Sequence, residues 1–423
     1  MANQFSKEER VAFEQILEGF QDAEVMARNV NVYKTDAQSM ERSGDVIWRP
    51  QPYVMNSFDG LDQSANFNDK TQLSVPATIN YIKSSPWLMT ATELNDALQE
   101  GRLGDAAKQK LASDINVAIL NIASMQGSMV VQVKAAATGF DDVAEIEATM
   151  NEQGVMDYER KLALSSRDYN GMAGNLADRQ TMNGKVNDAY TRSHVGQIAS
   201  FDTYKLDYAK RIGVAAGGAI TIATNAAGTF LTPASTGTNA INGGESNKDN
   251  RFDDVTVSAT ANVAAGDAFT IAGVNAVHHI TKEDTGQLKT FRVIEVVNGT
   301  TLKVAPPLID PNAGAGAESE VQYQNCIVNT ASATSAIKWL NTAATSINPF
   351  WQKDAIEILP GKLSIPENAG AAIMRGSTDS GIELVMTKQF DNKTMKTYFR
   401  LDTRFGVVNK APEQSGIIIF NQV

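Results

Sequence analysis

The stretch MKTYFRLDTRFGVVNKAPEQSGIIIF, residues 395–420, decides the fold class because it carries two strand patterns of different burial. Residues 398–405 alternate polar and apolar side chains, which is the period of a strand with one buried face. Pro412 interrupts this pattern, and the apolar run 417–420 predicts a second strand that is buried more deeply. A chain that closes on two strands with so little polar chemistry is more typical of a structural protein than of an enzyme.

The size and composition indicate an ordinary globular protein. The chain has 423 residues, 43% of them hydrophobic and 20% charged, enough for about two to four domains. Its net charge of −11 argues against binding nucleic acid through the phosphates, although an acidic wall can face nucleic acid without adhering to it. The N-terminus lacks the pattern of a signal peptide and the longest apolar run, 212–223, is too short to span a bilayer, so we expect a soluble chain.

The N-terminal segment 6–30 has the spacing of an amphipathic helix with Phe13, Ile16 and Phe20 on its apolar face. Its charges are of both signs, so the face suits a protein partner better than a membrane. Packing of this face on the helix's own domain is the alternative, and the sequence leaves both open.

Two strand-like segments, 45–55 and 71–82, predict the arms of an extended hairpin. Prolines in both segments exclude them from the middle of a sheet. The hairpin would carry Trp48, Tyr53 and Phe58 with too little core to be stable alone, so we expect it to lie on a neighbouring surface.

Helical periodicity is strongest over 103–134, which predicts a spine helix about 45 Å long. Further along, 160–166 predicts a strand, Ser166 marks the start of a helix, and 195–208 predicts a strand with a bend. Regularly spaced strands then fill 222–334, with a two-residue hairpin turn at Asn298-Gly299. This segment predicts a small β-barrel or sandwich inserted into a parent domain.

Candidate chemistry is sparse. His278 and His279 are adjacent and would point to opposite faces of a strand, His194 is isolated, and Cys326 lies in a buried strand pattern where a small hydrophobe is expected. We therefore expect no catalytic residue, no metal site and no cofactor.

One loop gathers charges of both signs: Glu245, Lys248, Asp249 and Arg251. Such a loop is usually only solvated. The alternative is that it exchanges ion pairs with a symmetry-related copy, since a two-fold contact needs a self-complementary patch.

Several segments, in order, resemble one known family. They are QSMERSGDVIWRPQ (38–51), LASDINVAILNIASMQGSMVV (111–131), RDYNGMAGNLADRQ (167–180), DNRFDDVTVSATANVAAGDAFTIAGV (249–274) and TFRVIEVVNGTTLKVAP (290–306). The chain is similar through them to the major capsid (coat) proteins of short-tailed, Salmonella-phage-type bacteriophages. The closing strands of 395–420 resemble those of tailed-phage capsid proteins generally.

The resemblance implies an α+β fold of the tailed-bacteriophage capsid type with an inserted all-β barrel. The implied parts are an N-terminal arm (1–35), an extended loop (36–85), a peripheral domain with the spine helix (86–137 and 396–423), an axial domain with β-hinge (138–221 and 335–395) and the barrel (222–334).

The resemblance also implies contacts and partners. Arg42, Trp48 and Arg49 would touch a neighbouring subunit, the charged loop at 245–251 would bridge capsomers, and the arm, with Phe13, Ile16 and Phe20, would face a scaffolding protein. Copies of the chain would form hexamers and pentamers of an icosahedral head, with a portal protein, around double-stranded DNA that is not read by sequence. Synthesis would take place in the host bacterial cytoplasm, with the virion capsid as the destination and no membrane involved.

Two alternatives remain from the residues themselves. A phage tail-tube or adhesin protein with an immunoglobulin-like module would account for the β segment, but the long helix argues against it. A hydrolase with a carbohydrate-binding β insert would need a convergent acid/base pair, and the sequence does not indicate one.

Overall fold

The structure is a computed structural model, and it describes residues 5, 7–33, 46–55, 57, 59–64, 66–67, 69–95, 97–178, 192–193, 195–222, 230–238, 243–312, 318–328, 335–366 and 370–423. The chain divides into two compact units, each built from separate stretches of sequence. Unit 1 comprises residues 1–47, 77–120 and 356–408, and unit 2 comprises residues 48–76, 121–355 and 409–423.

Unit 1 contains a mixed sheet. The first of the two closing strands lies inside this sheet and pairs with several of the others. In order, the sheet contains β1 (Asn31–Val32), β20 (Ile356–Pro360), β23 (Lys396–Asn409), β22 (Glu383–Asp391) and β21 (Ala372–Ser377), and β4 (Tyr81–Thr90) also pairs with β23. β1 runs parallel to β20, whereas β4 and β22 run antiparallel to β23.

The predicted alternation of β23 is correct as far as Arg400 and wrong beyond it. Asp402 and Arg404 are buried although the pattern places them on the polar face. Polar partners allow this: the carboxylate of Asp402 accepts a hydrogen bond from Arg400 at 2.6 Å, and Arg404 donates to the backbone oxygen of Lys362 at 3.4 Å.

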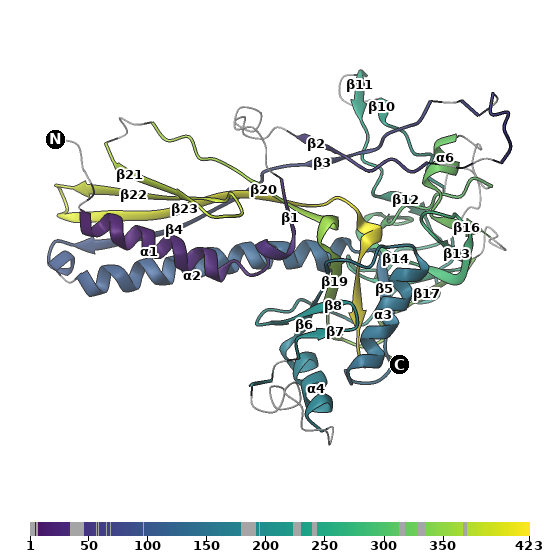
Figure 1. Ribbon diagram of the computed structural model, residues 1–423, viewed down its shortest axis with the longest axis horizontal. Coiled ribbons are helices and arrows are strands. Elements are labelled where there is room, and N and C mark those ends of the chain that lie inside the picture. The colour runs from purple at the N-terminus through teal and green to yellow at the C-terminus, as the bar shows by residue number, and fades with distance from the viewer. Residues whose placement is uncertain are drawn as a thin grey trace. The chain divides into compact units, whose positions relative to one another are not determined.

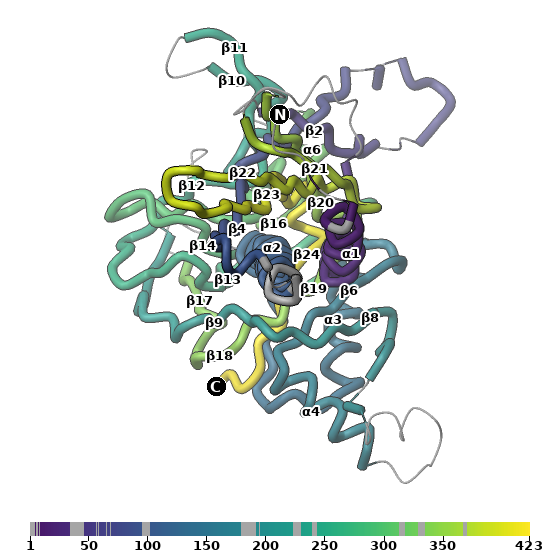
Figure 2. The backbone as a smooth tube through the Cα atoms, turned by 90° about the vertical axis from the view of Figure 1, so that its left-hand side faces the viewer, coloured from purple at the N-terminus to yellow at the C-terminus, as the bar shows by residue number. Residues whose placement is uncertain are grey.

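Two helices lie side by side along one face of this sheet (Figures 1 and 2): α1 (Lys7–Ala23) and the part of α2 (Ala97–Gln126) that belongs to unit 1, as far as residue 120. The helix predicted over 6–30 is confirmed, but it ends at Ala23. Asn116 of α2 accounts for this end: its side-chain amide donates to the oxygen of Ala23 at 3.0 Å and accepts from the amide of Met26 at 3.1 Å.

The spine helix also ends earlier than 134. Residues 129–132 form β5 (Met129–Gln132), a strand of unit 2, and not the last turns of the helix. The break falls at Gly127, where an added Cβ would lie 2.9 Å from the backbone of Gly416. Only glycine permits that approach, and helical periodicity alone cannot detect it.

Unit 2 contains a second mixed sheet that holds the other closing strand. Its order is β5, β24 (Ser415–Ile419), β19 (Asn348–Gln352), β6 (Arg160–Ser165), β8 (Phe201–Leu206) and β7 (Gln197–Ile198). The short helix η5 (Pro412–Gln414) joins β23 to β24, so the proline break is confirmed. The strands predicted at 160–166 and 195–208 are confirmed too, with the bend at Ala199.

The continuous apolar run of β24 follows from burial on both faces. Ile418 packs in the core that α3 (Phe140–Glu152) and α4 (Ser166–Ala177) share with the sheet. Ile417 and Ile419 belong to a different cluster, which includes Ala268 of the β segment. A strand with two buried faces reads as a run rather than an alternation.

The segment predicted as an inserted barrel contains a six-stranded antiparallel sheet with its own core. The sheet runs in the order β12 (Asp253–Thr256), β15 (Thr301–Ala305), β14 (Asp284–Asn298), β13 (Ala268–Val277) and β16 (Cys326–Val328), with β17 (Ile337–Trp339) also on β13. The hairpin turn at Asn298-Gly299 is confirmed. The strand order is open, so closure into a barrel stays a prediction.

Three short ribbons complete unit 2. They pair β2 (Ile47–Pro50) with β3 (Ser74–Ala77), β10 (Thr236–Thr238) with β11 (Glu245–Asn247), and β9 (Arg211–Ile212) with β18 (Thr345–Ser346). The remaining short helices are η1 (Ala27–Asn29), η3 (Glu93–Asn95), α6 (Glu318–Tyr323) and η4 (Lys353–Ala355).

Candidate functional site

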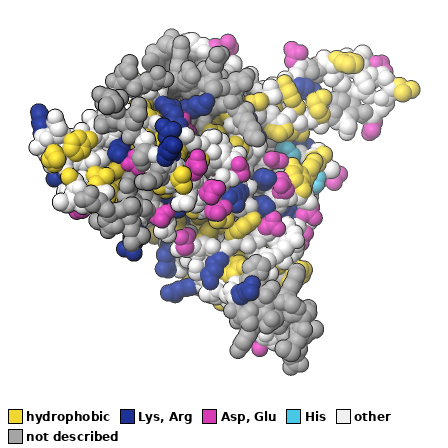
Figure 3. Space-filling view, turned by 60° about the vertical axis from the view of Figure 1, so that its left-hand side comes forward, with side chains coloured by type: hydrophobic (Ala, Val, Ile, Leu, Met, Phe, Trp, Pro, Cys, Tyr) yellow, Lys and Arg dark blue, Asp and Glu magenta, His cyan; other side chains and the backbone are white. Residues whose placement is uncertain are grey.

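The β2–β3 ribbon carries the first group of predicted contact residues. Trp48 and Arg49 are half-buried in β2, while Arg42 lies outside the described residues. The ribbon extends beyond its paired strands into a loop with large apolar side chains in solvent, and Figure 3 shows such side chains at its far end. These are Tyr53, Met55, Leu61 and Phe67, exposed by 54%, 66%, 105% and 86%.

In the charged loop at 245–251, some side chains already form contacts within the chain. Arg251 is nearly buried and forms a two-pronged ion pair with Asp249, with a shortest N–O distance of 2.8 Å. The third nitrogen of Arg251, Nη1, donates to the backbone oxygen of Asn409 at 2.9 Å. Glu245 is fully at the surface and Lys248 is half-buried, so these two side chains are the better placed for a contact between copies.

The apolar face of α1 packs within unit 1. Phe13, Ile16 and Phe20 are all buried. A Cβ on Gly104 of α2 would lie 2.8 Å from the tip of Ile16, which shows how closely the two helices approach. The structure therefore gives these three side chains the alternative role, packing on their own domain, and direct contact with a scaffold stays a prediction.

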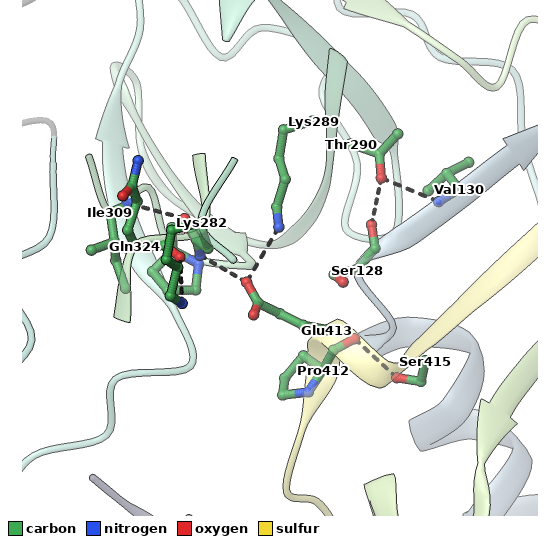
Figure 4. Close-up of polar contacts among 12 residues, drawn as sticks. Ser128, Val130, Lys282, Lys289, Thr290, Ile309, Gln324, Pro412, Glu413 and Ser415 are labelled. Carbon is green, nitrogen blue, oxygen red and sulfur yellow. Dashed lines mark hydrogen bonds and ion pairs between the residues drawn. The ribbon is translucent and has the colours of Figure 1, made fainter. Parts of the chain in front are cut away.

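A polar joint holds the β segment against the chain around η5 and β5 (Figure 4). Lys289 of β14 forms an ion pair with Glu413 of η5 at 3.3 Å, and the side chain of Asn325 donates to the same carboxylate at 2.8 Å. Beside it, Thr290 donates to the backbone oxygen of Ser128 at 2.8 Å and accepts from the amide of Val130 at 3.2 Å. The turn between the closing strands is thus fixed by side chains from another sheet.

The electrostatics of the joint favour negative charge. Burial alone would raise the pKa of Glu413, but Lys289, then His279, Asn325 and Lys282, outweigh it and hold the pKa below the ordinary range. The pKa of Lys282 is lowered to about 8, chiefly because the amine is buried, while Glu413 raises it and Lys289 lowers it. The shift of Glu413 indicates that positive charge predominates around its carboxylate.

The sequence did not single out Lys289 or Glu413, because 124 positions separate them and neither belongs to a short motif. The turn signal Pro412-Glu413 was visible, but a local turn does not indicate which strand its carboxylate meets.

The structure places most of the other candidates of the sequence. Cys326 is fully buried and burial raises its pKa to about 12, so the interpretation as a small hydrophobe is supported. The ring nitrogen Nδ1 of His278 accepts hydrogen bonds from the amides of Ile280 and Thr281, and His194 lies outside the described residues. Within the described ranges, no cluster of three or more His, Cys, Asp or Glu could hold a metal ion. No helix in the described part of the chain is long and apolar enough to cross a bilayer.

Comparison with known proteins gives a match over almost the whole chain. Residues 1–421 match the family described as P22 coat protein, gene protein 5. Among solved structures, one described as Mycobacterium phage Che8 is similar with a TM-score of 0.46 and 10% identity, over 94% of this chain and 90% of that chain. The capsid structure of the Cyanophage P-SCSP1u gives a TM-score of 0.43 and 10% identity over 93% and 87%. The CUS-3 coat protein I-domain is 33% identical with a TM-score of 0.21, over 29% of this chain and 96% of that chain.

Proposed function

Because the chain belongs to the P22 coat protein (gene protein 5) family, we propose that its copies form hexamers and pentamers of an icosahedral phage head. The expected identity as a phage coat protein with an α+β fold is confirmed by this match. The finer proposal adds a scaffolding protein during assembly, a portal protein, and double-stranded DNA enclosed without sequence-specific binding. The family supports this interpretation over a tail tube, an adhesin or a hydrolase.

The observation that carries the proposal is the exposed apolar loop of the β2–β3 ribbon. Soluble monomers seldom display a group of large apolar side chains as exposed as Leu61 and Phe67, and such groups mark interaction surfaces. A two-stranded ribbon has too little core to bury them itself. We infer that the extended loop, with Trp48 and Arg49 at its base, lies across a neighbouring copy, as 36–85 is expected to do.

Charge supports the same assignment. At −11 the chain would not adhere to packaged DNA, which an inner wall must release freely. Glu245 at the surface of the β10–β11 ribbon is placed to meet a cation of another copy, and Lys248 is the nearest candidate for that cation.

The test is assembly followed by electron microscopy, with the chain expressed alone and together with a candidate scaffold. We expect closed shells of uniform diameter with the scaffold. Replacing both Leu61 and Phe67 by serine should abolish shells while the purified monomer keeps its unfolding temperature. Val297→Ser, at a half-exposed apolar residue of β14, is the matched control and should assemble. Normal shells from the double variant would refute the role of the loop, and tubes in every preparation would refute the icosahedral proposal.

A further inference from the structure

A pocket of about 130 Å³ lies within unit 2, where the foot of the ribbon, the loop after α3, the β segment and η5 converge. Its walls are largely apolar and include Pro52 and Val54 of the ribbon and Pro307 and Ile309 of the β segment. An engineered apolar cavity of about 150 Å³ is known to bind benzene, so this pocket has the room for one compact ring or short aliphatic group.

One end of the pocket is charged. The side chain of Lys289 is only 4% exposed, whereas that of its partner Glu413 is 32% exposed, and both line the pocket. An ammonium group has three donors, and the one hydrogen bond found for Lys289 among the described residues is to Glu413 at 3.3 Å. His279 lines the same pocket, and its ring has no hydrogen-bond partner among the described residues.

Two further cations lie near Lys289, and neither supplies an acceptor for its free donors. Arg251 also lines the pocket but is neutralised by Asp249. Lys282 is close enough to be influenced by Lys289, and it donates to the backbone oxygen of Gln324 at 3.0 Å. Among the described residues, Glu413 is the carboxylate that pairs with Lys289 and whose charge acts on Lys282 and His279, and donors on Lys289 and His279 are left for an acceptor.

We propose that this pocket binds a carboxylate that carries a compact apolar group. The ammonium group of Lys289 donates the principal hydrogen bond to the carboxylate, and the apolar group packs on the proline-lined wall. His279 at the rim donates a second hydrogen bond. The chemistry is that of a small organic acid or of a carboxylate on a protein segment. The pocket adjoins the foot of the ribbon that is proposed to contact another copy, but binding is measured on the unassembled chain, so its failure would leave the proposed assembly function intact.

The experiment is a saturation-transfer NMR titration of the purified full chain with benzoate, beside benzamide as the uncharged ligand of the same shape. We expect saturable binding of benzoate and binding of benzamide at least about ten-fold weaker, since a charge-assisted hydrogen bond is lost. A peptide that ends in phenylalanine distinguishes a small organic acid from a protein segment as the source of the carboxylate. It is titrated with its C-terminus free and, as the uncharged control, with its C-terminus amidated. Tighter binding of the free peptide than of benzoate assigns the site to a protein segment, and weaker binding assigns it to a free acid.

Three variants separate the pocket from general effects. Lys289→Met keeps the apolar stem and should weaken benzoate at least about ten-fold, whereas Lys338→Met, at an exposed lysine of the same sheet, should have no effect. The double variant Lys289→Met with Glu413→Gln avoids leaving a carboxylate unpaired and should lose benzoate equally. Val54→Phe should fill the pocket and abolish binding with Lys289 in place. Equal binding of benzoate and benzamide, or undiminished binding in the lysine variants, would overturn the proposal.

Discussion

Glu24 connects the end of α1 to the turn after β21 through a buried carboxyl group, and its protonation should control how firmly that helix is held. The residue is 1% exposed. One oxygen accepts from the hydroxyl of Ser380 at 3.1 Å, while the other has no partner among the described residues. The pKa of Glu24 is raised from 4.5 to about 7, because burial outweighs the hydrogen bonds of Ser380 and Thr378 and the charge of Arg28, which lower it.

The sign of the effect follows from proton linkage. The folded state binds the proton more tightly, so this contribution to stability is complete below about pH 4.5 and is lost as the pH rises through 7. The full difference corresponds to about 3 kcal/mol. Glu24→Gln keeps the side chain neutral, so it should remove the pH dependence and stabilise α1 at pH 8 by up to about 3 kcal/mol.

The assay is native-state hydrogen exchange of the amides of α1 between pH 5 and 8, corrected for intrinsic exchange. At pH 8 the variant should be protected up to about a hundred-fold more strongly than the wild-type chain, and at pH 5 the difference should shrink to about four-fold. Glu14→Gln, at an exposed glutamate of the same helix, is the matched control and should follow the wild-type chain. Equal pH slopes in the Glu24 variant and the wild type would refute the reasoning.

Four further predictions concern two glycines, the buried thiol and the joint. Gly416→Ala should destabilise unit 2 by more than about 1–3 kcal/mol, because the new Cβ would lie 2.4 Å from a backbone oxygen of β5. A Cβ added at Gly174 of α4 would have no neighbour within 4 Å, so Gly174→Ala should stabilise the chain by about 0.5–1 kcal/mol. Denaturant midpoints equal to that of the wild-type chain would contradict both glycine predictions. Cys326 should resist a thiol reagent at pH 8 until the chain is unfolded, and rapid labelling of the native chain would disprove its burial. Thr290→Val should cost about 1–3 kcal/mol through its two lost hydrogen bonds to the chain entering β5, whereas Thr281→Val at an exposed site should be neutral in the same unfolding assay.

The sequence predicts best where local patterns decide the structure. The alternation before Arg400, the break at Pro412 and the turn at Asn298 were all readable, because each depends on neighbours a few positions apart. The recognition of the coat-protein family rested on longer segments in a fixed order, and the whole-chain match confirms it.

The errors arise where distant parts of the chain intervene. Helical periodicity predicts that the spine helix continues past Gly127, because the pattern contains no information about the backbone of Gly416, which packs against Gly127. Asp402 looked solvent-facing because the alternation does not show which other parts of the fold bury that residue of β23. The pairing of Lys289 with Glu413 is of the same kind, since nothing local distinguishes this lysine from an exposed one.

The foot of the ribbon suggests how the β segment takes part in assembly. Tyr323 and Gln322 of α6 donate to the backbone oxygen of Thr71 at 2.6 and 3.2 Å, and Gln51 donates to the backbone oxygen of Lys410 at 2.9 Å. Beyond this foot, the hydrogen bonds given by Gln63 stay within the loop itself. The β segment and the chain before η5 therefore hold the foot of the ribbon, and we expect its apolar end to adapt to the surface of a neighbouring copy. Such a division suits a coat protein, because a fixed foot limits the geometries that a copy can enter and an adaptable end keeps each contact weak enough to be corrected.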